Sequence, residues 1–161
     1  MPLPRFVADC MVGKLAKWLR AFGFDVVYQP FAEDRALLRA ARERGALLLT
    51  RDTGLRYVEG VRVLFILSDH VEEQLRQVVL EAPLDLALAQ PLTRCTACNG
   101  ELLTASRNEV WDRVPPFIYL THERYAACPD CARVYWAGTH VQHLLDRLAE
   151  LRARAQREEA A

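Results

Sequence analysis

The sequence carries no net charge and has very little lysine. Its 161 residues include 21 basic and 21 acidic side chains, and the lysines are only Lys14 and Lys17. Without an overall positive field, the chain has no long-range attraction for a polyanion. A nucleic acid would therefore have to be held by a local basic patch or through metal ions.

Long apolar runs are also missing. No stretch approaches the roughly 20 apolar residues that span a membrane, and residues 1–5 lack the basic and apolar regions of a signal peptide. We therefore expect a cytoplasmic protein with no membrane partner. In that reducing compartment, the five cysteines are interpreted as metal ligands plus one spare, Cys10, and not as disulfides.

Several common catalytic motifs do not occur. The chain contains no G-x-G-x-x-G and no G-x-x-x-x-G-K, which excludes the usual dinucleotide and P-loop phosphate sites. It has no G-x-S-x-G nucleophile turn. Asp9-Cys10-Met11 has no second acid two residues on, so the aspartyl-phosphate arrangement is excluded as well.

Short apolar runs alternate with amphipathic segments in the first half of the chain. The runs predict strands at residues 5–8, 25–28, 47–50 and 61–67, and the segments predict helices at about 11–22, 33–44 and 71–80. Strands that alternate with helices are typical of βαβ units. We therefore predict an α/β fold, a three-layer α/β/α sandwich with a parallel sheet, in a domain of residues 1–92.

The composition changes after Pro91. Residues 93–138 contain four cysteines and β-like runs such as Phe117–Leu120, and we assign them to a small zinc-ribbon domain. The apolar residues of the last segment recur at helical spacing, namely Val141, Leu144, Leu145 and Leu148. Residues 139–161 are therefore predicted to form a C-terminal helix.

Two C-x-x-C pairs predict a zinc site. Cys95 and Cys98 form the first pair, Cys128 and Cys131 form the second, and 29 residues separate them. Four thiolates close a tetrahedral zinc site with no open position, so such a site stabilises the fold and performs no catalysis. The alternative is two redox-active dithiols. Zinc is favoured because a segment too small for its own core usually needs a metal.

Four aspartates follow predicted strands. Asp9 and Asp52 come directly after strands, and Asp34 and Asp69 follow a few residues later. The carboxyl ends of parallel strands meet at one edge of a sheet, where ligands usually bind. Carboxylate oxygens suit Mg²⁺ or Mn²⁺, and such ions can activate a water and stabilise the leaving oxygen of a phosphodiester.

Each of these acids also has a simpler interpretation. Asp34 and Asp69 suit helix caps, and Asp52 suits a turn. Asp9 is the hardest to explain in this way, because it interrupts an otherwise apolar region. Lys14 and Lys17 share one face of the first predicted helix, where they either contact phosphates or simply face solvent.

The order of these motifs resembles the Mut7-C RNase domain family. The resemblance is carried by several stretches, namely Phe6–Asp9, Gly13–Arg20, Asp34 with Leu37-Leu38, Leu48–Asp52, the paired cysteines, Asp112–Pro116, and Tyr135-Trp136 with Gly138 and His140. It implies a PIN-like nuclease fold joined to a zinc ribbon, and a metal-dependent ribonuclease activity that leaves 5′-phosphate and 3′-hydroxyl ends.

The resemblance also implies roles for particular residues. Asp9, Asp34 and Asp52 match the acidic positions of the PIN-like site, and Asp69 matches a further polar position. We expect the three acids to bind Mg²⁺ or Mn²⁺, with Asp69 or Glu33 assisting. The expected partner is single-stranded RNA, with Lys14 and Lys17 holding its backbone. Tyr135 and Trp136, with Arg94, Arg107 and Arg133, either guide that strand or merely pack the ribbon against the sheet. The alternative function is a nucleic-acid- or protein-binding adaptor whose acidic site is vestigial.

Overall fold

A four-stranded parallel sheet lies at the centre of the computed structural model, which describes residues 3–82 and 84–161. The strand order is β2-β1-β3-β4, with bounds Arg5–Ala8 for β1, Asp25–Tyr28 for β2, Leu47–Thr50 for β3 and Val63–Phe65 for β4. Ala8 of β1 pairs with Tyr28 on one side and with Leu49 on the other. The predicted mixed α/β fold with a parallel sheet is confirmed.

Helices cover both faces of this sheet. Alternate residues of a strand point to opposite faces, so Phe6 and Leu49 pack in the same core as α1 (Gly13–Ala21) and α3 (Val71–Glu81). Val7 and Leu48 pack in a second core with α2 (Asp34–Arg44). All residues of β3 are buried, which explains why its sequence is continuously apolar up to Thr50.

Local chemistry sets the ends of the helices. Gly45 adopts a left-handed conformation with φ of 59° and ends α2, as its position after the last helical residue predicts. The helix expected at about residues 11–22 begins later, at Gly13, because a 3-10 turn (η1, Cys10–Val12) precedes it. The strand expected at 61–67 is shorter as well, and β4 covers only Val63–Phe65.

The cysteine-rich segment forms a second, antiparallel sheet. Its strands are β5 (Leu103–Ala105), β6 (Tyr125–Ala127) and β7 (Val134–Trp136), in that order. Two short helices, α4 (Arg107–Val110) and α5 (Pro116–Thr121), lie between β5 and β6. The β-like assignment of Phe117–Leu120 is therefore wrong. Pro116 occupies the first turn of α5, where its fixed φ favours a helix start.

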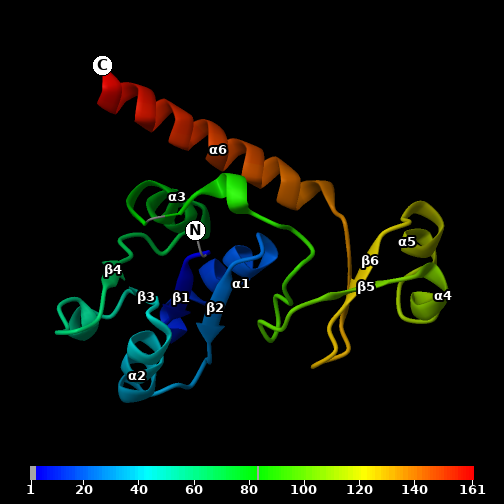
Figure 1. Cartoon of the computed structure of the whole chain (residues 1–161), viewed down its shortest axis with the longest axis horizontal. Coiled ribbons are helices and arrows are strands. Elements are labelled where there is room, and N and C mark those ends of the chain that lie inside the picture. Colours follow the sequence, from blue (N-terminus) through cyan, green and yellow to red (C-terminus); the bar gives the residue numbers. More distant parts are fainter. Residues whose placement is uncertain (1–2, 83) are drawn as a thin grey trace.

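The C-terminal helix α6 (Thr139–Ala160) packs against α3, beside the parallel sheet. Leu144, Leu145 and Leu148 are buried in the core that α1 and α3 share. Figure 1 shows α6 running across this helical layer, while α4 and α5 lie at the far end of the second sheet. The predicted C-terminal helix is confirmed, whereas the domain limits after residues 92 and 138 stay a prediction. None of the described helices is both long and apolar enough to cross a membrane.

Candidate functional site: a thiol cluster and a carboxylate edge

The two C-x-x-C pairs adopt the same turn. In each, the backbone amide of the residue after the second cysteine donates to the carbonyl of the first, from Asn99 to Cys95 and from Ala132 to Cys128, both at 2.9 Å. The residue after the second cysteine is left-handed in both turns, with φ of 70° at Asn99 and 64° at Ala132. The repeated geometry turns four sulfurs toward one point.

The four sulfur atoms lie within 4.8 Å of one another. The pairs Cys95–Cys131 and Cys98–Cys128 each have Sγ atoms 3.5 Å apart. A donor set of four thiols at this spacing fits a tetrahedral metal such as zinc. The structure therefore confirms the sequence-based prediction that these cysteines form one cluster able to hold a metal.

The surroundings of the cluster affect its thiols in opposite ways. Burial raises the pKa of Cys95, but hydrogen bonds from the Tyr135 hydroxyl, two backbone amides and the Cys131 thiol lower it to about 6. The backbone N–H of Gly100 lowers the pKa of Cys98, whereas the Cys128 thiol, burial and the other two thiols raise it to about 12. Four thiolates cannot sit together without a cation, and a bound metal removes that conflict.

The left-handed Ala132 predicts a stabilising substitution. A residue with a Cβ atom costs about 1–2 kcal/mol in this conformation, whereas glycine adopts it freely. Allowing for the extra freedom of glycine in the unfolded chain, we expect Ala132→Gly to raise the free energy of unfolding by about 0.5–1 kcal/mol. Urea denaturation of the metal-loaded protein measures this change.

Ala126→Gly is the matched control for that substitution. Ala126 lies in the centre of β6, where glycine is expected to lower stability by about 0.5–1 kcal/mol. A destabilised Ala132→Gly protein would contradict the strain assigned to this turn.

The first cysteine turn is bonded to the edge of the parallel sheet. The side-chain oxygen of Asn99 accepts a hydrogen bond from the backbone N–H of Val26 at 3.0 Å, and its side-chain nitrogen donates to the Asp25 carboxylate at 2.8 Å. These bonds give the outer strand β2 a partner. Arg20 of α1 is only 3% exposed and donates to the carbonyl oxygens of Val26, Thr96 and Ala97. Burial lowers the pKa of Arg20, and the nearby Cys95 and Cys98 oppose that shift.

Arg20 therefore fixes the thiol cluster relative to α1. Arg20→Met keeps much of the packing but leaves three carbonyl acceptors without their donor, and we expect a loss of about 2–4 kcal/mol in the free energy of unfolding. Chemical denaturation measures this loss. Arg39→Met, at an exposed position on α2, should change stability by less than about 0.5 kcal/mol, and equal effects at the two positions would contradict the role of Arg20.

The four predicted acids belong to segments that follow the strands at one edge of the parallel sheet. Because all four strands are parallel, the strand order places the segments carrying Asp34, Asp9, Asp52 and Asp69 side by side in that sequence. Asp9 and Asp52 follow the two central strands, β1 and β3, which are direct neighbours. Asp34 and Asp69 belong to the segments after the two outer strands.

Asp9 is a buried carboxylate held by three donors. It is 3% exposed, and its Oδ1 accepts the amide of Met11 at 2.8 Å. Its Oδ2 accepts the Thr50 hydroxyl and the amide of Arg51, the latter at 3.0 Å. No ion pair to Asp9 occurs within residues 3–82 and 84–161. Two carboxylate oxygens offer about four acceptor positions, so one position on Asp9 is left for a further ligand.

Thr50 connects Asp9 to the Asp52 segment. The Thr50 hydroxyl donates to Asp9 and accepts the backbone amide of Asp52 at 3.0 Å. The half-buried Asp52 also accepts the amide of Gly54 through Oδ1 at 2.8 Å, which caps the 3-10 turn η2 (Thr53–Leu55). Asp52 therefore does act as a turn residue, as the simpler interpretation predicts. This role leaves its partly exposed carboxylate accessible to a ligand.

Asp34 and Asp69 are both exposed. Neither caps its helix as the simpler interpretation proposed, because Glu33 and His70 occupy the cap positions of α2 and α3. Asp69 lies 3.5 Å from the His70 imidazole. Across the described part of the chain, the four cysteines are the one group of three or more metal-binding side chains whose ligand atoms lie within 4.8 Å. The acidic metal site thus stays a prediction.

Lys14 and Lys17 lie in a cavity beside this edge. The cavity has a volume of about 910 Å³ and is lined by both lysines, by Asp69, and by Arg133 and Tyr135 of the cysteine-rich segment. Both lysines are exposed on the outer face of α1. Among the four predicted acids, Asp69 is the one that the lining includes.

A family model described as the Mut7-C RNAse domain matches residues 4–148. The chain belongs to this family. The match includes Asp9, Asp34, Asp52, Asp69 and all four clustered cysteines. Membership indicates a ribonuclease, with RNA as its substrate. Neither curated proteins nor solved structures give a match.

Sequence reasoning missed two residues that organise this Mut7-C RNAse domain, Arg20 and Asn99. Arg20 belongs to the Gly13–Arg20 stretch, but the sequence interpretation assigns it no buried role. The available signal is its position on the buried face of α1, one residue after Leu19 and one turn after Ala16. The contacts of Asn99 join residues more than 70 positions apart, and no local pattern predicts such a pairing.

Proposed function

We propose that this Mut7-C RNAse domain is a metal-dependent endoribonuclease that uses the edge formed by Asp9 and Asp52. The observation that carries the proposal is Asp9, a buried carboxylate with three hydrogen bonds, one remaining acceptor position and no ion pair among the described residues. Burying an unpaired charge is costly, and a cation at this edge would offset that cost.

The donor set fits a hard divalent cation. Asp9 and Asp52 would hold Mg²⁺ or Mn²⁺, with Asp34 as a further ligand and Asp69 assisting from the neighbouring segment. When bound, such an ion lowers the pKa of water and stabilises negative charge on a phosphate. Thr50 and the backbone amides of Met11 and Arg51 keep the Asp9 carboxylate in place.

Hydrolysis would occur by in-line displacement at phosphorus. A bond would form between the water oxygen and phosphorus as the bond to the 3′ oxygen breaks. The water gives up one proton, the 3′ oxygen takes one up from solvent, and the products carry 5′-phosphate and 3′-hydroxyl ends. Lys14 and Lys17, exposed on α1 beside the edge, would bind the phosphates on either side of the cleaved bond.

The thiol cluster would hold structural zinc. Four thiols leave no open coordination position, so this site would stabilise the cysteine-rich domain and keep it against β2. Cysteines that bind a metal must stay reduced, which favours a reducing compartment, and we propose the cytoplasm on that ground.

Cleavage of a single-stranded oligoribonucleotide in Mn²⁺ tests the proposal. We expect internal cuts, products with 5′-phosphate ends, and loss of cleavage on chelation that returns when Mn²⁺ is restored. Zinc content is measured in each sample, so that loss of zinc is not mistaken for loss of the catalytic cation. Cleavage that persists at full rate in the chelator would contradict the proposal, and no cleavage at all would favour the adaptor function.

A further inference from the structure

Three cavities adjoin one another along α1. The first is the cavity of about 910 Å³ beside the carboxylate edge, the second measures about 280 Å³, and the third about 500 Å³. Lys14, Lys17 and Thr96 line both the first and the second. Ala21, Thr96 and Val141 line both the second and the third. Together they form one groove, which we call the α1 groove.

One face of α1 forms the floor of the α1 groove. Lys14, Lys17, Trp18 and Ala21 follow the spacing i, i+3, i+4 and i+7, which places them in a row along one side of the helix. The opposite side of α1 is buried in the core through Leu15 and Leu19. The row therefore leads from the carboxylate edge at the start of α1 to the cysteine-rich domain and α6 at its end.

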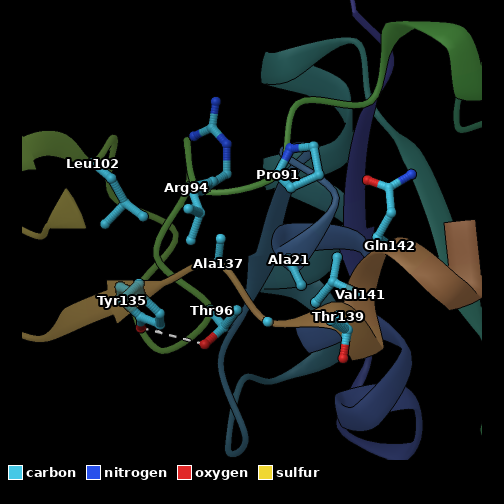
Figure 2. Close-up of a pocket in the computed structure, with 12 residues that line it drawn as sticks. Ala21, Pro91, Arg94, Thr96, Leu102, Tyr135, Ala137, Thr139, Val141 and Gln142 are labelled. Atoms are coloured by element: carbon cyan, nitrogen blue, oxygen red, sulfur yellow. Dashed lines mark hydrogen bonds between the residues drawn. The ribbon is translucent and has the colours of Figure 1, made fainter. Parts of the chain in front are cut away.

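The chemical character of the groove changes along this row. At the carboxylate edge, Lys14, Lys17 and Arg133 supply positive charge. At the other end the cavity is largely apolar, and Figure 2 shows Ala21 and Val141 on one side with Leu102 and Tyr135 on the other. Arg94 and Gln142 also line this end, where Arg94 donates to the carbonyl oxygens of Gly23 and Asn99 and Gln142 donates to Asp146.

Tyr135 is held in a fixed position between the two ends. Its hydroxyl lies 3.0 Å from the Cys95 sulfur and 3.3 Å from the Thr96 hydroxyl, and it lines both the charged and the apolar cavity. Because its hydroxyl is engaged in this way, the ring is presented to the groove without a loss of side-chain freedom on binding. The thiol cluster thus sets the shape of the groove wall.

We infer that the α1 groove binds single-stranded RNA, with phosphates on Lys14 and Lys17 and an unpaired base in the apolar cavity at Ala21, Tyr135 and Val141. This inference rests on the proposed nuclease function and extends it by naming a strand path and a base pocket away from the cleaved bond. Two lysines match the charge of a phosphate backbone. An apolar cavity walled by an aromatic ring suits a nucleobase. A paired base cannot enter it, so the groove selects single strands.

The phosphate half of the inference is tested by binding of a fluorescent oligoribonucleotide in buffer without added divalent cations, where no cleavage is expected. Each lost phosphate contact lowers the slope of log K against log salt by about 0.7 for single strands. The Lys14→Gln/Lys17→Gln double variant should therefore lower that slope by about 1.4. Arg35→Gln/Arg39→Gln removes two exposed charges from α2 and should leave the slope unchanged. Equal slopes for the two double variants would overturn the assignment.

The base pocket is tested by filling it. Ala137 is exposed, lies outside the helices and strands, and lines the apolar cavity. Ala137→Trp should weaken RNA binding by about tenfold, a value within the range for one stacked base. Ala36→Trp, at an exposed position on α2, is the control and should bind as the wild type does. Wild-type affinity in Ala137→Trp would overturn the base pocket and leave that cavity to another occupant.

Changing the RNA instead of the protein tests the base pocket without any risk that a variant protein misfolds. A series in which each position in turn lacks its base should contain one position, away from the cut, at which binding by the wild-type protein falls about tenfold. A series in which no position changes binding by more than about twofold would overturn the inference.

Different results contradict the two proposals. RNA binding in the α1 groove without any cleavage in Mn²⁺ would contradict the nuclease function and support the groove. Cleavage with no dependence of binding on any base would support the nuclease function and contradict the base pocket.

Discussion

Asp52→Asn is expected to lower the rate of RNA cleavage in Mn²⁺ by at least about a hundredfold, with little change in stability. Asparagine keeps the side-chain oxygen that accepts the amide of Gly54, so the cap of η2 survives. It removes the negative charge that would hold the cation. Initial cleavage rates at the lowest Mn²⁺ concentration that saturates the wild type, together with a thermal melt of each protein, measure the two effects.

Asp85→Asn is the matched control for this variant. Asp85 caps the 3-10 turn η3 (Leu86–Leu88) by accepting the amide of Ala87 at 2.9 Å, which is the same local bond that Asp52 makes. Asp85 follows α3 and no strand of the parallel sheet, and its turn η3 packs against α6. We expect Asp85→Asn to cleave at the wild-type rate, and equal loss of activity in the two variants would reduce Asp52 to a structural cap.

Asp9 is a poorer test position than Asp52. Its two oxygens accept three hydrogen bonds in a nearly fully buried site. An asparagine NH₂ group in place of Oδ2 cannot accept from Thr50 and Arg51. Asp9→Asn would therefore lose stability and activity together. Only a variant that separates the two distinguishes a metal ligand from a buried structural acid.

Cys128→Ser is expected to unfold the cysteine-rich domain. Binding of zinc to small four-ligand sites contributes about 10–16 kcal/mol to folding at neutral pH, and replacing one thiolate forfeits much of that contribution. We expect zinc content to fall from about one equivalent to less than half. Near-ultraviolet circular dichroism should change as Tyr125 and Tyr135 lose their fixed surroundings.

Cys10→Ser controls for the general effect of losing a thiol. Cys10 is exposed and lies outside the cluster, so this variant should keep its zinc and its spectrum. A Cys128→Ser protein with full zinc and unchanged spectra would contradict the structural role of the thiol cluster. Because Arg20 joins the cluster to α1, RNA binding in the α1 groove should weaken in Cys128→Ser as well.

Local patterns predicted the elements of the parallel-sheet domain well. The apolar run of β3, the helical spacing in α1 and the glycine at the end of α2 each reflect forces that act over a few residues. The two C-x-x-C pairs predicted the thiol cluster, because the spacing of two cysteines within one turn is set by neighbouring residues. The helix α5 was not predicted because its run of apolar and aromatic residues is typical of a strand. Phe117 and Leu120 are exposed, so no buried helical face marks the segment as a helix.

The candidate site was only partly predictable. The sequence indicates which acids follow strands, but the strand order that makes Asp9 and Asp52 neighbours arises from packing between distant segments. The bond from Arg20 to the cysteine turn spans more than 70 residues and has no local signature. The α1 groove is lined by α1, the cysteine-rich segment and α6. The sequence of any one of these segments predicts neither the groove nor its change from charged to apolar.

Crystals of the protein soaked in Mn²⁺ and measured at the manganese absorption edge test the central claim most directly. The account predicts an anomalous peak at the carboxyl ends of β1 and β3, within coordination distance of an Asp9 oxygen and an Asp52 oxygen. A map with no manganese at that edge, in crystals where the thiol cluster is intact, would contradict it.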